Sequence, residues 1–283
     1  MNKIAIVTDT DSSLPVDLAN QYGIRQVPIT IHFEDSSYTT GIDIDDRLLF
    51  EIIDRQKKLP TTSAPSPSAF ANAYEAAFKD GADSIVCICV SSKVSATYNS
   101  AVTASEMFPG QDISVIDSLN LSMGQGFMVL AAAEAASQGA TKEEIITQAL
   151  AAGQRTHLFA VLATVKYLAM SGRVGKLAAG MADTLNIKPI LTVRDGKLDL
   201  LERIRTRKKA VARVLELTQS SVNGKTVERV AFMHANNLPG AQELHGQLCN
   251  LLTCPSSIIM TDFTPGLSVH AGSGVVGVTL LTN

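Results

Sequence analysis

The stretch SIVCICVSSKVSATYNSA, from Ser84 to Ala101, joins a short apolar run to a segment rich in hydroxyl side chains. Its first part, Ser84 to Val90, is apolar and partly β-branched, which is typical of a buried strand. The polar part follows where a strand enters a helix, and the free N–H groups of a helix's first turn favour an anion. The hydroxyl donors there belong to Ser91, Ser92, Ser95 and Thr97. These side chains could equally cap the helix, so the sequence leaves both roles open.

The rest of the chain repeats this order of strand and helix. Similar apolar runs are KIAIVTD, QVPITIHF, ISVID, LFAVLATV, KPILTV, RVAFMHA and SSIIMTDF. Between them, residues 47–55 and 210–217 carry apolar side chains at helical spacing. Thr141 and Glu144 form a capping box in front of another helix. Alternating strands and helices predict an α/β fold with mostly parallel sheets covered by helices.

Length and charge limit the possible organisation and partners. With 283 residues, the chain can form one large domain or two small ones. Long helical stretches between Gly124 and His157 predict a break near residue 150. We therefore expect α/β domains over residues 1–152 and 153–283 that meet at a cleft. A net charge of -3 provides no basic field for a phosphate backbone, which argues against a nucleic-acid partner.

The apolar runs and the cysteines indicate the compartment. No apolar run approaches the ~20 residues that span a bilayer, and the amino terminus lacks the apolar core of a signal peptide. We expect a cytoplasmic protein with no transmembrane segment. Cys87, Cys89, Cys249 and Cys254 are then expected to be buried thiols in a reducing environment. Their spacing matches a zinc site poorly, so we expect neither a metal nor a cofactor.

Two acidic residues, Asp9 and Asp11, follow the first apolar run in VTDTDSS. Ligands bind at the carboxyl ends of strands in open parallel sheets, and a D-x-D pair there resembles that of haloacid dehalogenase-like phosphatases. Such an enzyme also needs a later acidic pair for magnesium, which the chain does not offer in a suitable place. Capping of the next helix is the alternative role for these residues.

Two further segments combine polar side chains with restricted backbone or positive charge. LPTTSAPSPSAF, Leu59 to Phe70, holds hydroxyls on a stretch stiffened by proline, which suits either a cap or a binding loop. In ERIRTRK, alternation places Arg203, Arg205 and Arg207 on one side of an extended segment. This charge run can be a solvated face, and Arg173 of SGRVGK or Arg205 can also serve an anion site.

The glycines of VHAGSGVVGV, Val269 to Val278, spell the G-x-G-x-x-G pattern of dinucleotide-binding loops. That pattern acts through a helix beginning at the glycines, because the pyrophosphate rests on the helix N-terminus. The VTLLTN that follows Gly277 alternates like a strand, which argues against a nucleotide site. The glycines then indicate close backbone approach or positive φ, and His270 stands just ahead of them.

Taken in order, these stretches resemble the DegV family of bacterial fatty-acid-binding proteins, the lipid-carrying subunits of a fatty acid kinase. The resemblance runs nearly end to end. The matching segments are IVTDTDSSLP, TTSAPSPSAF, VSSKVSATYNSA, VIDSLNLSMGQG, VKYLAMSGRVGK, NIKPIL, RIRTRKKA, FMHANN and VHAGSGVVGV.

The resemblance implies a two-domain protein that encloses a long-chain fatty acid at or near the domain interface. The family's carboxylate-binding positions fall on Thr62, Ser63, Ser95 and His270, with Arg173 and Arg205 as supporting charges. It also implies a carrier rather than an enzyme: a partner kinase phosphorylates the presented carboxylate to an acyl phosphate. Brief contact with a membrane surface would then serve lipid exchange.

The sequence departs from the family pattern at small residues of the site-lining loops, namely Ala64, Ala96, Ser171 and Ser273. Two other functions remain open: a magnesium-dependent phosphatase that uses Asp9 and Asp11, and a regulatory domain that binds a different apolar anion.

Overall fold

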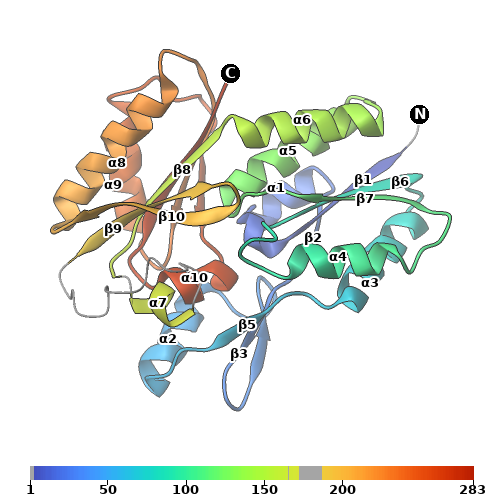
Figure 1. Ribbon diagram of the computed structural model, residues 1–283, viewed down its shortest axis with the longest axis horizontal. Coiled ribbons are helices and arrows are strands. Elements are labelled where there is room, and N and C mark those ends of the chain that lie inside the picture. Colours follow the sequence, from blue (N-terminus) through green and yellow to red (C-terminus); the bar gives the residue numbers. More distant parts are fainter. Residues whose placement is uncertain (1–2, 165, 172–186) are drawn as a thin grey trace. The chain divides into compact units, whose positions relative to one another are not determined.

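The computed structural model describes residues 3–164, 166–171 and 187–283 and divides into two compact units (Figure 1). Unit 1 comprises Met1–Asp43 and Thr61–Gln154, and unit 2 comprises Ile44–Pro60 and Arg155–Asn283. The later break lies after Gln154, close to the expected boundary. The segment 44–60, expected in the N-terminal domain, belongs to unit 2.

The main sheet of unit 1 is parallel throughout. Its strands, in the order β2-β1-β6-β7, are β2 (Arg25–Val27), β1 (Ile4–Asp9), β6 (Ser84–Cys89) and β7 (Asp112–Asp117). Every residue of β6 is buried, because helices cover both faces of the sheet. Figure 1 shows α3 (Pro67–Lys79) and α4 (Thr97–Ser105) on one side, and α5 (Met123–Ser137) and α6 (Lys142–Gln154) on the other.

Short elements complete unit 1. The turn η1 (Thr10–Ser12) and the helix α1 (Val16–Gln21) follow β1, and a small antiparallel sheet has the order β4-β3-β5. Its strands are β4 (Ser37–Thr39), β3 (Thr30–His32) and β5 (Thr61–Ser63). The run QVPITIHF, expected as one strand, is divided between β2 and β3, because Pro28 lacks the N–H that a ladder requires.

The six-stranded sheet of unit 2 is mostly antiparallel, so the expectation of mostly parallel pairing is wrong for this sheet. Its order is β10-β9-β8-β13-β11-β12, and of the five described pairings only β11 with β12 is parallel. The strands are β8 (Thr156–Val161), β9 (Lys188–Arg194), β10 (Lys197–Ile204), β11 (Val227–His234), β12 (Ile259–Asp262) and β13 (Val276–Thr282).

Two features explain the antiparallel order. Asp195 and Gly196 both have positive φ, 50° and 77°, and form the two-residue connection of the β9–β10 hairpin. The late strand β13 then inserts antiparallel between β8 and β11.

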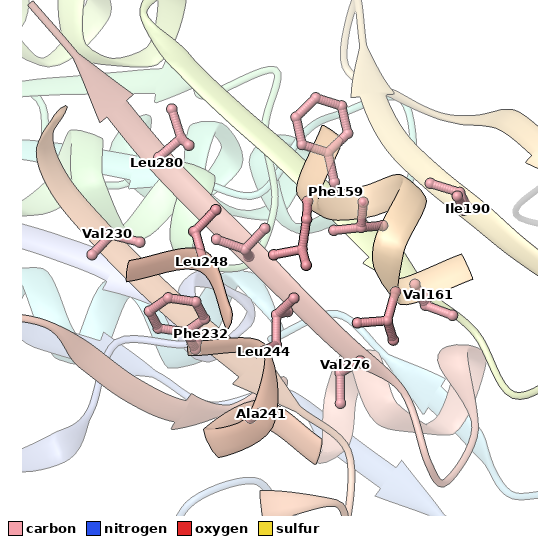
Figure 2. Close-up of a cluster of buried hydrophobic side chains, with 14 of the residues drawn as sticks. Phe159, Val161, Ile190, Val230, Phe232, Ala241, Leu244, Leu248, Val276 and Leu280 are labelled. Atoms are coloured by element: carbon pink, nitrogen blue, oxygen red, sulfur yellow. The ribbon is translucent and has the colours of Figure 1, made fainter. Parts of the chain in front are cut away.

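The core of unit 2 lies between this sheet and two helices, α8 (Arg207–Val222) and α9 (Leu238–Cys249). Figure 2 shows Val230, Phe232, Val276 and Leu280 of β11 and β13 near Ala241, Leu244 and Leu248 of α9. Phe159 and Val161 belong to the same cluster and lie on β8, which packs against α8. Three shorter helices also belong to unit 2: α2 (Asp46–Gln56), α7 (Lys166–Ser171) and α10 (Pro265–Ala271).

Two local expectations need correction. The extended segment that was to align Arg203, Arg205 and Arg207 ends at Ile204, because the Thr206 side chain accepts the Lys209 N–H and starts α8 at Arg207. Cys249 and Cys254 form a disulfide instead of remaining thiols, because the end of α9 brings them together.

The other two cysteines are free and buried, as predicted: Cys87 and Cys89 lie on β6. Among the described helices, none is both long and apolar enough to cross a membrane.

Candidate functional site

The hydroxyl pair Thr62 and Ser63 lies on β5, at one edge of the small sheet of unit 1. Thr62 is paired with Ile31, which is fully buried, and is itself half-buried. Ser63 is exposed. Successive side chains of a strand point to opposite faces, so these neighbouring hydroxyls face opposite sides of the sheet. The structure therefore does not bring the two side chains together.

The Ser63 hydroxyl already has a partner on its own face. His32 of β3 lies with Nε2 2.7 Å from the Oγ of Ser63 and Nδ1 2.8 Å from the Oγ of Ser37. The imidazole therefore links three strands through two hydroxyls. Sequence reasoning missed His32, although its alternation within the run TIHF places it opposite Ile31.

In the loop after β6, Ser92 and Ser95 have different hydrogen-bond partners, so the choice between a structural role and anion binding differs between the two serines. Ser92 is a structural residue: its N–H and Oγ donate to the Asp117 carboxylate at 3.1 and 2.5 Å. Ser95 is half-buried, lies 2.8 Å from the Thr97 hydroxyl, and accepts the Thr97 N–H at 3.3 Å. Ser95 thus lies at the start of α4, where backbone N–H groups favour an anion.

Asp9 is enclosed by protein donors. Its carboxylate accepts N–H groups from Asp11 at 2.9 Å, Val90 at 2.8 Å and the Gln125 side chain at 3.1 Å. Burial raises the pKa of Asp9 from 3.8 to about 6, while these donors act in the opposite direction. A phosphatase nucleophile must reach its phosphoester, and Asp9 is fully buried. The geometry favours the capping role, and the described residues contain no group of three or more acidic, histidine or cysteine side chains able to hold a metal.

His270 lies in the last turn of α10 in unit 2 and is half-buried. The helix ends at Gly272, whose φ of 84° and ψ of 161° suit only glycine. A Cβ at Gly272 would lie 2.4 Å from the Tyr167 ring of α7. The glycines thus allow close approach to the end of α10. After Gly277 the chain continues as β13, which confirms that the dinucleotide helix is absent.

The turn that follows His270 is stabilised by hydrogen bonds from residues that the sequence analysis did not connect with this turn. The Gly274 carbonyl accepts from the Arg207 guanidinium at 2.9 Å and from the Asn237 side chain at 3.0 Å. The Gly274 N–H donates to the Ala235 carbonyl at 2.8 Å. Arg207 is therefore a structural clamp and does not share a solvated face with its basic neighbours.

Arg205 and Arg173 are the two positions that the resemblance implies as supporting charges. Arg205 is exposed in the connection between β10 and α8. Arg173 lies outside the described residues.

A buried polar contact also joins α10 to α2. Ser268, two residues before His270, donates its hydroxyl to Asp46 at 2.7 Å. Burial raises the pKa of Asp46 from 3.8 to about 7. No sequence pattern could have joined these residues, which are 222 positions apart.

Comparison with known proteins covers the whole chain. The pattern of the family described as "Uncharacterised protein, DegV family" matches residues 3–283. The chain belongs to the DegV family. A DegV domain-containing protein of Caldanaerobacter subterraneus subsp. tengcongensis is 34% identical over 278 residues, which are 98% of each chain. The family resemblance inferred from the ordered motifs is therefore confirmed.

Two solved DegV structures share the fold. A structure described as "Fatty Acid Binding of a DegV family Protein from Thermus thermophilus" has a TM-score of 0.93 and 28% identity, covering 99% of this chain and 100% of its own. DegV of Bacillus subtilis, described as a fatty acid binding protein, has a TM-score of 0.89 and 28% identity, with 100% coverage of both chains. The α/β fold of this DegV protein is thus that of fatty-acid-binding relatives.

Proposed function

We propose that this DegV protein binds a long-chain fatty acid and holds its carboxylate with Thr62, Ser63, Ser95 and His270. Arg173 and Arg205 would contribute supporting positive charge. The observation that carries the proposal is the near-complete structural match to the Thermus thermophilus protein, whose printed description is fatty acid binding. The hydroxyls on β5 and at the start of α4 supply the donor chemistry that a carboxylate requires.

The acyl chain and the polar residues of the proposed site make different contributions to binding. A buried carboxylate is costly unless donors and positive charge compensate it, which hydroxyls and an imidazole do. Each buried methylene of the acyl chain contributes about 0.8 kcal/mol, so the tail supplies most of the gross binding energy. The polar residues then determine which end of the ligand remains reachable.

In this proposal the protein is a carrier and catalyses no reaction itself. A partner kinase phosphorylates the presented carboxylate, and the acyl phosphate stays bound until acyl transfer. The protein acts in the cytoplasm and exchanges its lipid during brief contact with a membrane surface. This DegV protein needs no cofactor of its own for that role.

Lipid extraction and native mass spectrometry of gently purified protein test the ligand. We expect a C14 to C18 fatty acid at one per chain, and we expect His270→Ala to retain less of it. Reproducible absence of such a lipid, with no uptake on addition, would reject the lipid assignment.

The carrier role needs a separate assay. The loaded protein, mixed with ATP and the catalytic subunit of a fatty acid kinase, should yield an acyl phosphate that hydroxylamine traps. The protein without that subunit should yield none. Acyl phosphate formation by this chain and ATP alone would overturn the division of labour.

A further inference from the structure

The polar contact between α2 and α10 lies in the interior of unit 2. Asp46 is 3% exposed and Ser268 is fully buried, and the Ser268 hydroxyl donates to one carboxyl oxygen of Asp46 at 2.7 Å. The other carboxyl oxygen, Oδ1, is buried and has no hydrogen-bond partner among the described residues. A core position with one satisfied and one unsatisfied oxygen is costly, so its presence requires a reason.

The surroundings of Asp46 disfavour the charged form of its carboxyl group. Burial raises its pKa to about 7, and the nearby Asp262 and Asp45 carboxylates act in the same direction. The Ser268 hydroxyl and His234 act in the opposite direction. His234 itself lies 2.9 Å from Asp262, at the ends of the paired strands β11 and β12. On α10 itself, the titratable side chain is that of His270.

The contact determines how α10 is rotated. This helix has only seven residues, and it begins at Pro265, shortly after β12 ends at Asp262. Each helical residue turns by about 100°, so side chains two positions apart point in nearly opposite directions. Ser268 points to Asp46, and His270 must therefore point away from α2. A bond that fixes Ser268 also fixes the direction of the His270 imidazole.

We infer that Asp46 is a positioning residue for His270, acting through its buried hydrogen bond to Ser268. The inference rests on the proposed function, because it assumes that His270 contacts the bound carboxylate. Without the acceptor, α10 gains rotational freedom and the imidazole must be ordered when the ligand binds. When Asp46 ionises, its unsatisfied oxygen favours local opening of α10, with the same effect on the ligand.

Four single variants of the full-length protein separate these effects. Asp46→Asn keeps an acceptor for Ser268 and cannot ionise, whereas Asp46→Leu has similar branching and no acceptor. Ser268→Ala removes the donor. Glu51→Gln is the matched control, since it neutralises an exposed carboxylate on the same helix α2.

Titration with a fluorescent long-chain fatty acid at pH 6 and pH 8 gives the readout, with thermal unfolding in parallel. Loss of a single buried hydrogen bond corresponds to roughly tenfold weaker binding, which we expect for Asp46→Leu and Ser268→Ala at pH 6. Asp46→Asn should bind like the wild type at pH 6 and lose less affinity on moving to pH 8. Glu51→Gln should follow the wild type at both pH values.

The double variant Ser268→Ala/His270→Ala distinguishes positioning from general stability. If Ser268 acts through His270, the double variant binds no more weakly than His270→Ala alone. Additive losses would overturn the inference, as would wild-type affinity in folded Ser268→Ala. If the wild type takes up no fatty acid, or if His270→Ala alone has no effect, it is the proposed function that fails.

Discussion

Replacing Gly272 by alanine should destabilise unit 2, because this position combines a glycine conformation with a close neighbour. The backbone has φ 84° and ψ 161°, a region that side chains disfavour by about 1–3 kcal/mol. The added methyl carbon would lie 2.4 Å from Cδ2 and 2.7 Å from Cε2 of Tyr167. Relieving that overlap requires α7 or the ring to move, at a further cost of about 1–3 kcal/mol.

The two contributions predict a loss of roughly 2–6 kcal/mol in the free energy of unfolding, measured by urea denaturation at constant pH. The Tyr167→Ala variant separates the backbone contribution from the contribution of the overlap with the ring. In that background the ring is absent, so Gly272→Ala should cost only the backbone contribution of about 1–3 kcal/mol.

Gly246→Ala is the matched control of opposite sign. Gly246 lies within α9, and a Cβ there would meet no atom within 4 Å. Alanine should stabilise this helix by about 0.5–1 kcal/mol. Equal unfolding curves for Gly272→Ala and Gly246→Ala would refute the reasoning, because they would show that neither the dihedral angles nor the Tyr167 ring restricts the turn.

Thr62→Val should weaken fatty acid binding more than Ser63→Ala in the same titration, because Thr62 shares the apolar face of the small sheet with Ile31, whereas Ser63 lies on the opposite face beside His32. A larger effect of Ser63→Ala would reverse the assignment. Cys254→Ser should lower the free energy of unfolding by about 2 kcal/mol under oxidising conditions, as expected for so short a loop, and should have no such effect in reductant. Stability should fall as pH rises from about 4 toward 7, because the folded-state pKa values of Asp9, about 6, and Asp46, about 7, exceed the unfolded value of 3.8. Each carboxyl group contributes a slope of about 1.4 kcal/mol per pH unit within its own window, and Asp46→Asn should reduce the slope most near pH 6–7.

The parallel half of the fold could be predicted from the sequence because its signals are local. The run Ser84 to Val90 is apolar on both faces, which suits a central parallel strand, and polar residues mark its carboxyl end. The pairing in unit 2 could not be obtained in this way. An apolar run such as that of β13 reads alike in parallel and antiparallel sheets, and its insertion between β8 and β11 depends on contacts distant in sequence.

The basic segment around Arg205 shows how a local signal can mislead. Alternating charges suggested a strand, but the Thr206 side chain caps the Lys209 N–H and starts a helix. That start turns the Arg207 guanidinium toward the Gly274 carbonyl. Nothing in the sequence links these two positions, 67 residues apart. The clamp was therefore beyond prediction, whereas the cap was visible as a hydroxyl residue in front of a helical pattern.

The pair Thr62 and Ser63 illustrates what a motif does not specify. In the sequence these two residues are adjacent and both carry a hydroxyl group. On a strand, however, adjacent side chains point to opposite faces and have different surroundings. Ile31 and His32 alternate in the same way on the neighbouring strand, so the apolar face carries Thr62 and the polar face carries Ser63. An acyl chain favours the apolar face, because burying its methylenes there removes apolar surface from water. The proposed carboxylate site should therefore depend more on Thr62 than on Ser63, whose hydroxyl also contacts His32.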